Sequence, residues 1–153
     1  MIDHKTNLEK LSIIIFSGYY DKIHYALVMA AAAAAVGRSV TLFFTMGACQ
    51  ALKLSDSSGN PSWHKLPLSE KHKSETDNCG KTRDDQYAAQ KLATFDSLLE
   101  SCIQLDVTFM VCELGLKAEG LKKLNLRTDI PFQEGGVVTF LNDTSKDGKV
   151  IFI

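Results

Sequence analysis

The N-terminal part of the chain alternates between strand-like and helix-like patterns of apolar residues. Residues 11–16 (LSIIIF) form a largely apolar run, typical of a strand buried on both faces of a parallel sheet. Residues 22–36 predict a helix, with Asp21 as its N-cap and Gly37 as a left-handed C-cap. Residues 39–44 (SVTLFF) predict a second strand. A strand, a helix and a strand in this order form a βαβ unit, so we expect parallel pairing with a right-handed crossover.

The middle of the chain has a weaker pattern. Residues 46–54 predict a short helix, and residues 53–85 contain two of the three prolines and the only tryptophan, with many Ser, Asp and Lys residues. We interpret residues 53–85 as an inserted surface loop. Periodicity resumes at Gln86, where apolar residues spaced by four, three, four and three predict one helix face. This face consists of Ala88, Leu92, Phe95, Leu99 and Cys102.

The C-terminal part returns to alternating strands and helices. Residues 107–111 (VTFMV) predict a third strand that ends at Cys112. The next helix is predicted to have an inner stripe of Leu114, Ala118, Leu121 and Leu124. Residues 137–145 fit a helix or part of an antiparallel hairpin; we prefer the helix, because a last parallel strand at residues 150–153 needs a crossover. Residues 1–153 are therefore predicted to form a single α/β domain with a mostly parallel sheet.

Charge and hydropathy exclude two classes of partner. Seventeen Lys and Arg residues against eighteen Asp and Glu give a net charge of −1, so the basic surplus expected of a nucleic-acid binder is absent. The longest apolar stretch, residues 26–36, is shorter than the ~20 residues that span a membrane. The opening residues do not resemble a secretory signal, so we expect a cytoplasmic protein whose four cysteines are free thiols.

Neither a metal nor a cofactor is expected from the motifs. His64, His72 and Cys79 are spaced H-x₇-H-x₆-C, which lacks the short paired spacings of structural zinc sites. The first strand is not followed by the G-x-G-x-x-G pattern of dinucleotide-binding proteins.

Cys112 is the strongest candidate for a reactive group. Ligands of open parallel sheets gather beyond the carboxyl ends of the strands, where the strand order switches direction. With a strand order of 2-1-3-4, Cys112 at the end of strand three faces the loop after strand one. The start of the following helix stabilises a thiolate, Lys22 adds positive charge, and Glu113 opposes it. The predicted lining residues are Ser17, Gly18, Tyr19, Lys22 and Glu113. The alternative is that Cys112 is a small buried apolar residue.

Three segments of the chain resemble the DsrE/DsrF/TusD family of small sulfur-relay proteins. They are SIIIFSGYYDKIHYALVMAAAAAAVGRSVTLFFTMG, VTFMVCELGLKAEGL and FQEGGVVTFL…VIFI, which together cover most of the chain except the insertion and the first few residues. The resemblance implies a flavodoxin-like three-layer sandwich and homo-oligomers built as trimers or hexamers. It also implies a persulfide on the cysteine at the end of the third strand, the place of Cys112 in MVCELGL.

The resemblance thus implies a sulfur-transfer protein that receives sulfur from a protein donor and passes it from Cys112 to a partner thiol. Whether this makes the protein an enzyme, a sulfurtransferase, stays open. One alternative is an oligomeric adaptor or small-ligand-binding module, and another is a two-cysteine thiol oxidoreductase. Cys49 is either a packed helix residue or a disulfide partner of Cys112, and Cys79 is either a second sulfur carrier or an exposed bystander.

Overall fold

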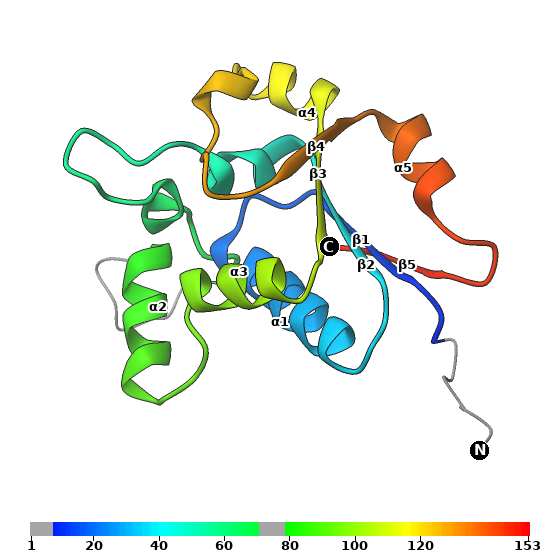
Figure 1. Cartoon of the computed structure of the whole chain (residues 1–153). Helices are drawn as coiled ribbons and strands as arrows, with labels where there is room; N and C mark the ends of the chain where they lie inside the picture. Colours follow the sequence, from blue (N-terminus) through cyan, green and yellow to red (C-terminus); the bar gives the residue numbers. More distant parts are fainter. Residues whose placement is uncertain (1–7, 71–78) are drawn as a thin grey trace.

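The computed structural model describes residues 8–70 and 79–153, and its centre is a five-stranded parallel sheet (Figure 1). The strand order is β4-β3-β2-β1-β5, and every pair of neighbours is parallel. The strands are β1 (Leu11–Ile15), β2 (Val40–Phe44), β3 (Thr108–Cys112), β4 (Phe132–Gly135) and β5 (Lys149–Phe152). The predicted flavodoxin-like α/β class with a mostly parallel sheet is confirmed.

The predicted strand order 2-1-3-4 is wrong, because β2 lies between β1 and β3. The first three crossovers carry the chain in one direction across the sheet, from β1 to β4. Only the last crossover reverses this direction and places β5 beside β1. The point where the strand order switches is therefore between β1 and β5, two strands away from β3.

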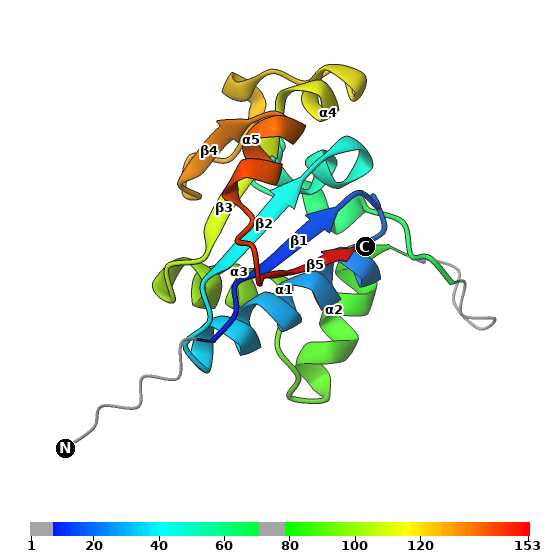
Figure 2. The same cartoon turned by 90° about the vertical axis from the view of Figure 1, so that its right-hand side faces the viewer.

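Helices lie on both faces of the sheet. One face is covered by α1 and α3, and α5 lies on the other face (Figures 1 and 2). The α-helices are α1 (Tyr20–Ala35), α2 (Gly80–Ala89), α3 (Phe95–Gln104), α4 (Glu113–Ala118) and α5 (Val137–Asp143), and the 3-10 helices are η1 (Met46–Leu52), η2 (Ser62–Lys65) and η3 (Lys123–Asn125). The helix preferred for residues 137–145 and the parallel last strand are both confirmed.

The two faces of the sheet carry cores of very different size. Side chains from β1, β2 and β3 pack against α1 and α3 in one large apolar cluster. The opposite face carries a separate buried cluster of only four residues, Phe43, Met110, Cys112 and Phe140, with Ile14 packed against it. Cys112 thus belongs to the smaller core, on the α5 side.

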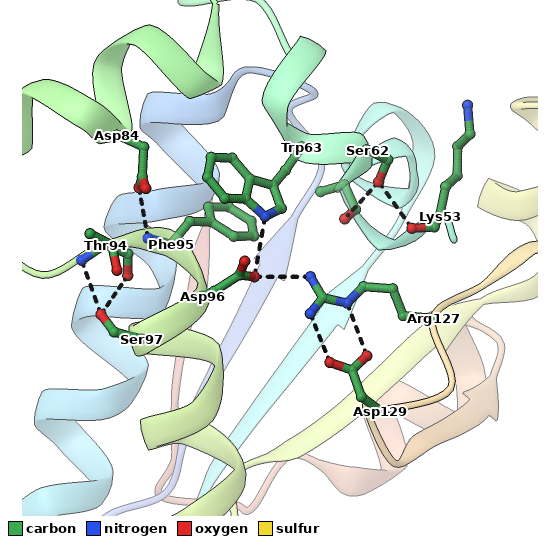
Figure 3. Close-up of polar contacts among 11 residues, drawn as sticks. Lys53, Ser62, Trp63, Asp84, Thr94, Phe95, Asp96, Ser97, Arg127 and Asp129 are labelled. Carbon is green, nitrogen blue, oxygen red and sulfur yellow. Dashed lines mark hydrogen bonds and ion pairs between the residues drawn. The ribbon is translucent and has the colours of Figure 1, made fainter. Parts of the chain in front are cut away.

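The segment predicted as an inserted surface loop contributes to the large core. The Trp63 ring in η2 is buried and stacks on Phe95 with the ring centroids 4.8 Å apart. Its Nε1 donates a hydrogen bond to Asp96 Oδ1 (3.2 Å), which also accepts one from Arg127 (3.1 Å; Figure 3). The interpretation of residues 53–85 as a surface loop is wrong for η2 and for the first turns of α2. His72 lies outside the described residues.

The continuous helix predicted from Gln86 onward is two helices, α2 and α3. Lys91 in the connection has a left-handed backbone (φ 59°), which an α-helix does not accommodate. A new helix starts after Thr94, whose N–H donates to Ser97 Oγ (3.0 Å) while that hydroxyl donates to the Thr94 carbonyl (2.8 Å; Figure 3). The apolar spacing continued across this break by coincidence, and Leu92 is exposed.

Two further local predictions are corrected. The N-cap of α1 is Tyr19 and not Asp21, whose carboxylate instead accepts hydrogen bonds from the backbone N–H (2.8 Å) and the hydroxyl of Ser69. The inner stripe predicted after β3 is also wrong, because α4 ends at Ala118 and Leu124 is exposed.

Candidate functional site

An open pocket of about 1210 Å³ lies at the carboxyl ends of β1 and β5. This is the switch point of the strand order, where ligands of open α/β sheets usually bind. Four of the predicted lining residues are in its wall, namely Ser17, Gly18, Tyr19 and Lys22. The remaining lining residues are Phe16, Asp21, Tyr25, Met46, Gly47, Pro67, Glu119, Phe152 and Ile153.

Two glycines bring the loops after β1 and β2 into contact beside this pocket. A Cβ on Gly18 would lie 3.1 Å from the Gly47 carbonyl oxygen, and a Cβ on Gly47 would lie 3.0 Å from the Gly18 nitrogen. Each position therefore has room only for glycine unless the other loop shifts. Met46, just before Gly47, adopts a left-handed backbone (φ 46°) as the chain turns out of β2.

Aromatic side chains form much of the pocket wall. The Phe16 and Phe152 rings are 5.6 Å apart between centroids, which joins the ends of β1 and β5. On the α1 side, Lys22 Nζ lies 5.8 Å from the centroid of the Tyr19 ring. The pocket therefore combines apolar walls with a cation at its edge, a composition suited to small organic ligands.

Cys112 lies outside this pocket. It is the last residue of β3, pairs with Gly135 of β4, and serves as N-cap of α4 without a capping hydrogen bond from its side chain. Its side chain is only 1% exposed, in the small cluster with Phe43, Met110 and Phe140. Because β2 separates β3 from β1, the structure does not bring this thiol to the Ser17–Lys22 loop.

Glu113 follows Cys112 and points to the surface. It forms an exposed ion pair with Lys117, with Oε1 3.1 Å from Nζ one helical turn later. An exposed pair of this kind contributes little to stability, and Glu113, unlike the other four predicted lining residues, does not line the pocket.

Cys49 lies in η1 near the start of α4. A Cβ on Gly115 of α4 would lie 2.5 Å from the Met46 nitrogen, so the two elements are in close contact. Burial, together with the nearby Cys112 and Glu119, raises the pKa of the Cys49 thiol to about 12. Cys49 is therefore a neutral, packed thiol in this structure.

The remaining two thiols differ in exposure. Cys102 is fully buried on α3, and burial raises its pKa to about 12. Cys79 is partly exposed before α2, with its Sγ 3.3 Å from Thr82 Oγ1. Of the four cysteines, Cys79 is the one that solvent reaches directly.

Neither a group of metal-ligating side chains nor a membrane-spanning helix is found in the described part of the chain. Within residues 8–70 and 79–153, no three His, Cys, Asp or Glu side chains are close enough together to hold a metal ion. His24 is mostly buried and its Nε2 lies 2.9 Å from the Ala93 carbonyl oxygen; burial lowers its pKa. Among the described helices, none combines the length and hydropathy needed to cross a bilayer.

Sequence reasoning missed the pocket residues contributed by the ends of β2 and β5. Gly47 and Phe152 reach the pocket only because β2 and β5 flank β1, and the sequence pattern does not fix this order. Glu119, which was also missed, reaches it from the end of α4. The Gly47 turn directly after the second strand was the feature of the sequence that could have identified part of this pocket. Interpreted together with the Gly18 turn, it indicates two loops that approach each other closely.

Comparisons with known proteins agree with this architecture. The model of the DsrE/DsrF/DrsH-like family matches residues 7–152. No curated protein matches the chain in sequence. The crystal structure of the ychN protein from E. coli superposes with a TM-score of 0.54 at 16% identity, covering 95% of this chain and 100% of that chain, and this likeness shows the fold. With the family model matching nearly the whole sequence, the chain belongs to the DsrE/DsrF/DrsH-like family.

Proposed function

We propose that this protein carries sulfur as a persulfide on Cys112 and passes it to a partner thiol. Proteins of its family generally act in sulfur relay. The observation that carries the proposal is the position of Cys112, the last residue of β3 and the residue before α4. This is the position at which the family resemblance implies the persulfide cysteine.

The proposed chemistry is a thiol exchange that conserves atoms and electrons. The Cys112 thiolate attacks the outer sulfur of a donor persulfide, a new sulfur–sulfur bond forms on Cys112, and the donor bond breaks. The donor cysteine leaves as a thiolate with the bonding electron pair, and the proton of the outer sulfur stays with that sulfur. In the second step an acceptor thiolate attacks the outer sulfur of the Cys112 persulfide, and Cys112 leaves as a thiolate.

Burial of Cys112 affects both the storage of the persulfide and its transfer to a partner. A thiol enclosed by Phe43, Met110 and Phe140 is shielded from small oxidants, which protects a stored persulfide. Exchange with another protein requires that the sulfur becomes accessible. The proposal therefore includes an open form of the protein in which Cys112 reaches solvent or a partner.

The proposal also includes self-association. The face of β1 and β5 opposite α1 has no helix over it in Figure 2. Phe16, Val150 and Phe152 are exposed there, with Phe152 at 65%. Parallel sheets are normally covered on both faces. A second copy of the chain covering this patch would bury the exposed aromatic rings, in line with the trimers or hexamers implied by the family resemblance.

Intact mass spectrometry after exposure to inorganic polysulfide tests the persulfide proposal. We expect a gain of about 32 Da, one sulfur atom, that a reductant removes. Cys112→Ser should abolish this gain, whereas Cys102→Ser, a matched change at another buried thiol, should retain it. Sulfur that still loads on Cys112→Ser, for example on the partly exposed Cys79, would refute the assignment.

A second candidate function is favoured by the pocket at the ends of β1 and β5. Its position at the switch point and its aromatic wall fit a small-ligand-binding module. The two functions are separable because Cys112 does not line this pocket. Cys112→Ser should abolish sulfur loading and leave ligand binding at the pocket intact.

A further inference from the structure

We propose that α5 is a hinged cover over Cys112, which lifts from the sheet to expose the thiol and returns to enclose it. This inference rests on the proposed function, since it explains how a buried cysteine takes part in sulfur exchange. Three features of α5 fit such a movement: one buried anchor, one polar clasp and few other contacts with the sheet.

The anchor is Phe140. It is the one buried residue of α5, with 1% exposure, and it belongs to the same four-residue cluster as Cys112. Its ring stacks on Phe43 of β2 with the centroids 4.6 Å apart and the planes 22° from parallel. Met110 of β3 completes the cluster. When Phe140 leaves, the cluster on this face of the sheet is reduced to the side chains of β2 and β3.

The clasp is Asp143, the last residue of α5. Its Oδ2 accepts hydrogen bonds from Lys10 Nζ (2.6 Å) and from Thr41 Oγ1 (2.7 Å). Lys10 Nζ also donates to the Asp143 backbone carbonyl (2.9 Å). These contacts tie the C-terminal end of α5 to the amino-terminal ends of β1 and β2, far from Cys112 at the opposite end of β3.

The rest of α5 has few apolar contacts with the sheet. Val137, Val138 and Leu141 are exposed, so releasing Phe140 loses most of the apolar contact that holds the helix. Gly136 precedes α5, and a Cβ at this position would meet no atom within 4 Å. Backbone rotation at this open glycine lets α5 move without disturbing β4. The five-stranded sheet keeps all its pairings, because α5 contributes no strand to it.

The proposed movement of α5 is local and therefore differs from global unfolding. Lifting α5 exposes Cys112 on the α5 face but leaves the large core on the other face intact. Cys102 belongs to that large core. Its reactivity therefore measures global opening, whereas the reactivity of Cys112 measures global opening together with the movement of α5.

The experiment is native-state alkylation with N-ethylmaleimide, with each cysteine read separately by peptide mass spectrometry. Phe140→Ala should raise the alkylation rate of Cys112 relative to Cys102 by on the order of 100-fold. Asp143→Asn, which removes the charge that Lys10 binds, should raise it by about fivefold. Leu141→Ala is the matched control, a truncation on the exposed face of the same helix, and should leave the ratio unchanged.

Low concentrations of urea add a second measurement for variants that are less stable. A lifting helix exposes little surface, so the Cys112 rate should be nearly independent of urea while the Cys102 rate rises steeply. If both cysteines respond in parallel, or if Phe140→Ala leaves the ratio unchanged, α5 is not a cover. The outcome is separate from the fate of the proposed function: faster alkylation of Phe140→Ala without sulfur loading would keep the cover and refute the persulfide.

Discussion

A buried hydrogen bond between Tyr20 and Asp84 gives the most direct test of how the inserted segment is joined to the core. Tyr20 of α1 is fully buried and its hydroxyl donates to Asp84 Oδ1 at 2.5 Å. The same oxygen accepts a hydrogen bond from the Phe95 backbone N–H at 2.7 Å, shown in Figure 3. One carboxylate on α2 therefore connects the first turn of α1 to the first turn of α3. Burial, followed by the contact with Asp84, raises the pKa of Tyr20, so the hydroxyl stays a donor.

The expected losses of unfolding free energy follow from the number of hydrogen-bond donors that each substitution removes or leaves unpaired. Tyr20→Phe keeps the ring and its packing on Trp63 and Phe95 but loses one hydrogen bond to a charged acceptor, worth about 1.5–3 kcal/mol. Asp84→Ala leaves two buried donors without an acceptor, which costs about 2–6 kcal/mol. Because the two changes remove one shared contact, the loss of stability in the double variant should be smaller than the sum of the two single losses by about 1.5–3 kcal/mol.

Urea unfolding monitored by the fluorescence of Trp63, the only tryptophan, measures these free energies. The control is Tyr25→Phe on the same helix, where the side chain is exposed and the loss should stay within ~0.5 kcal/mol. If Tyr20→Phe is as stable as Tyr25→Phe, or if the double variant shows no coupling, the hydrogen bond does not hold the segment in place.

Two further predictions concern α5 and the exposed sheet face. Partial burial tends to raise the pKa of Asp143, but the hydrogen bonds from Lys10 and Thr41 outweigh it and hold that pKa below its ordinary value. The stabilisation by ionised Asp143 is therefore present above about pH 4 and is lost as the pH falls through the lower pKa of the folded state. Between pH 5 and 2 the free energy of unfolding should decline less steeply in Asp143→Asn than in the unaltered protein. Phe152→Glu, beside Val150, should shift the protein towards monomers in light scattering, and a monomeric unaltered protein would contradict the proposed self-association.

The strands with strong apolar runs were predictable, and the strand with a weak one was not. The central strands β1, β2 and β3 are almost fully buried, so their apolar runs identify them. β4, with the sequence FQEG, is a half-exposed edge strand whose central two residues are exposed and polar. Its identity as a strand depends on pairing with β3, a tertiary contact that leaves no local pattern.

The position of Cys112 along the chain was predictable, but its surroundings were not. The end of an apolar strand followed by a helix start locates the residue correctly at the end of β3. Which loops flank it depends on the strand order, and that order is decided by which neighbour each crossover reaches. Four of the five residues predicted to line its site do share a pocket, because they follow one strand and turn together into α1. That pocket lies at the β1/β5 edge and excludes Cys112 because β2 intervenes.

The pairing of β5 with β1 has a consequence for synthesis on the ribosome. Leu11 pairs with Lys149, so β1 acquires this neighbour only after more than a hundred further residues have been translated. Until then the nascent chain presents one unprotected edge of β1, the strand that contains Ile13 and Ile15, to other nascent chains and to chaperones. A released chain that ends before Lys149 should therefore aggregate far more than one that includes residues 149–153.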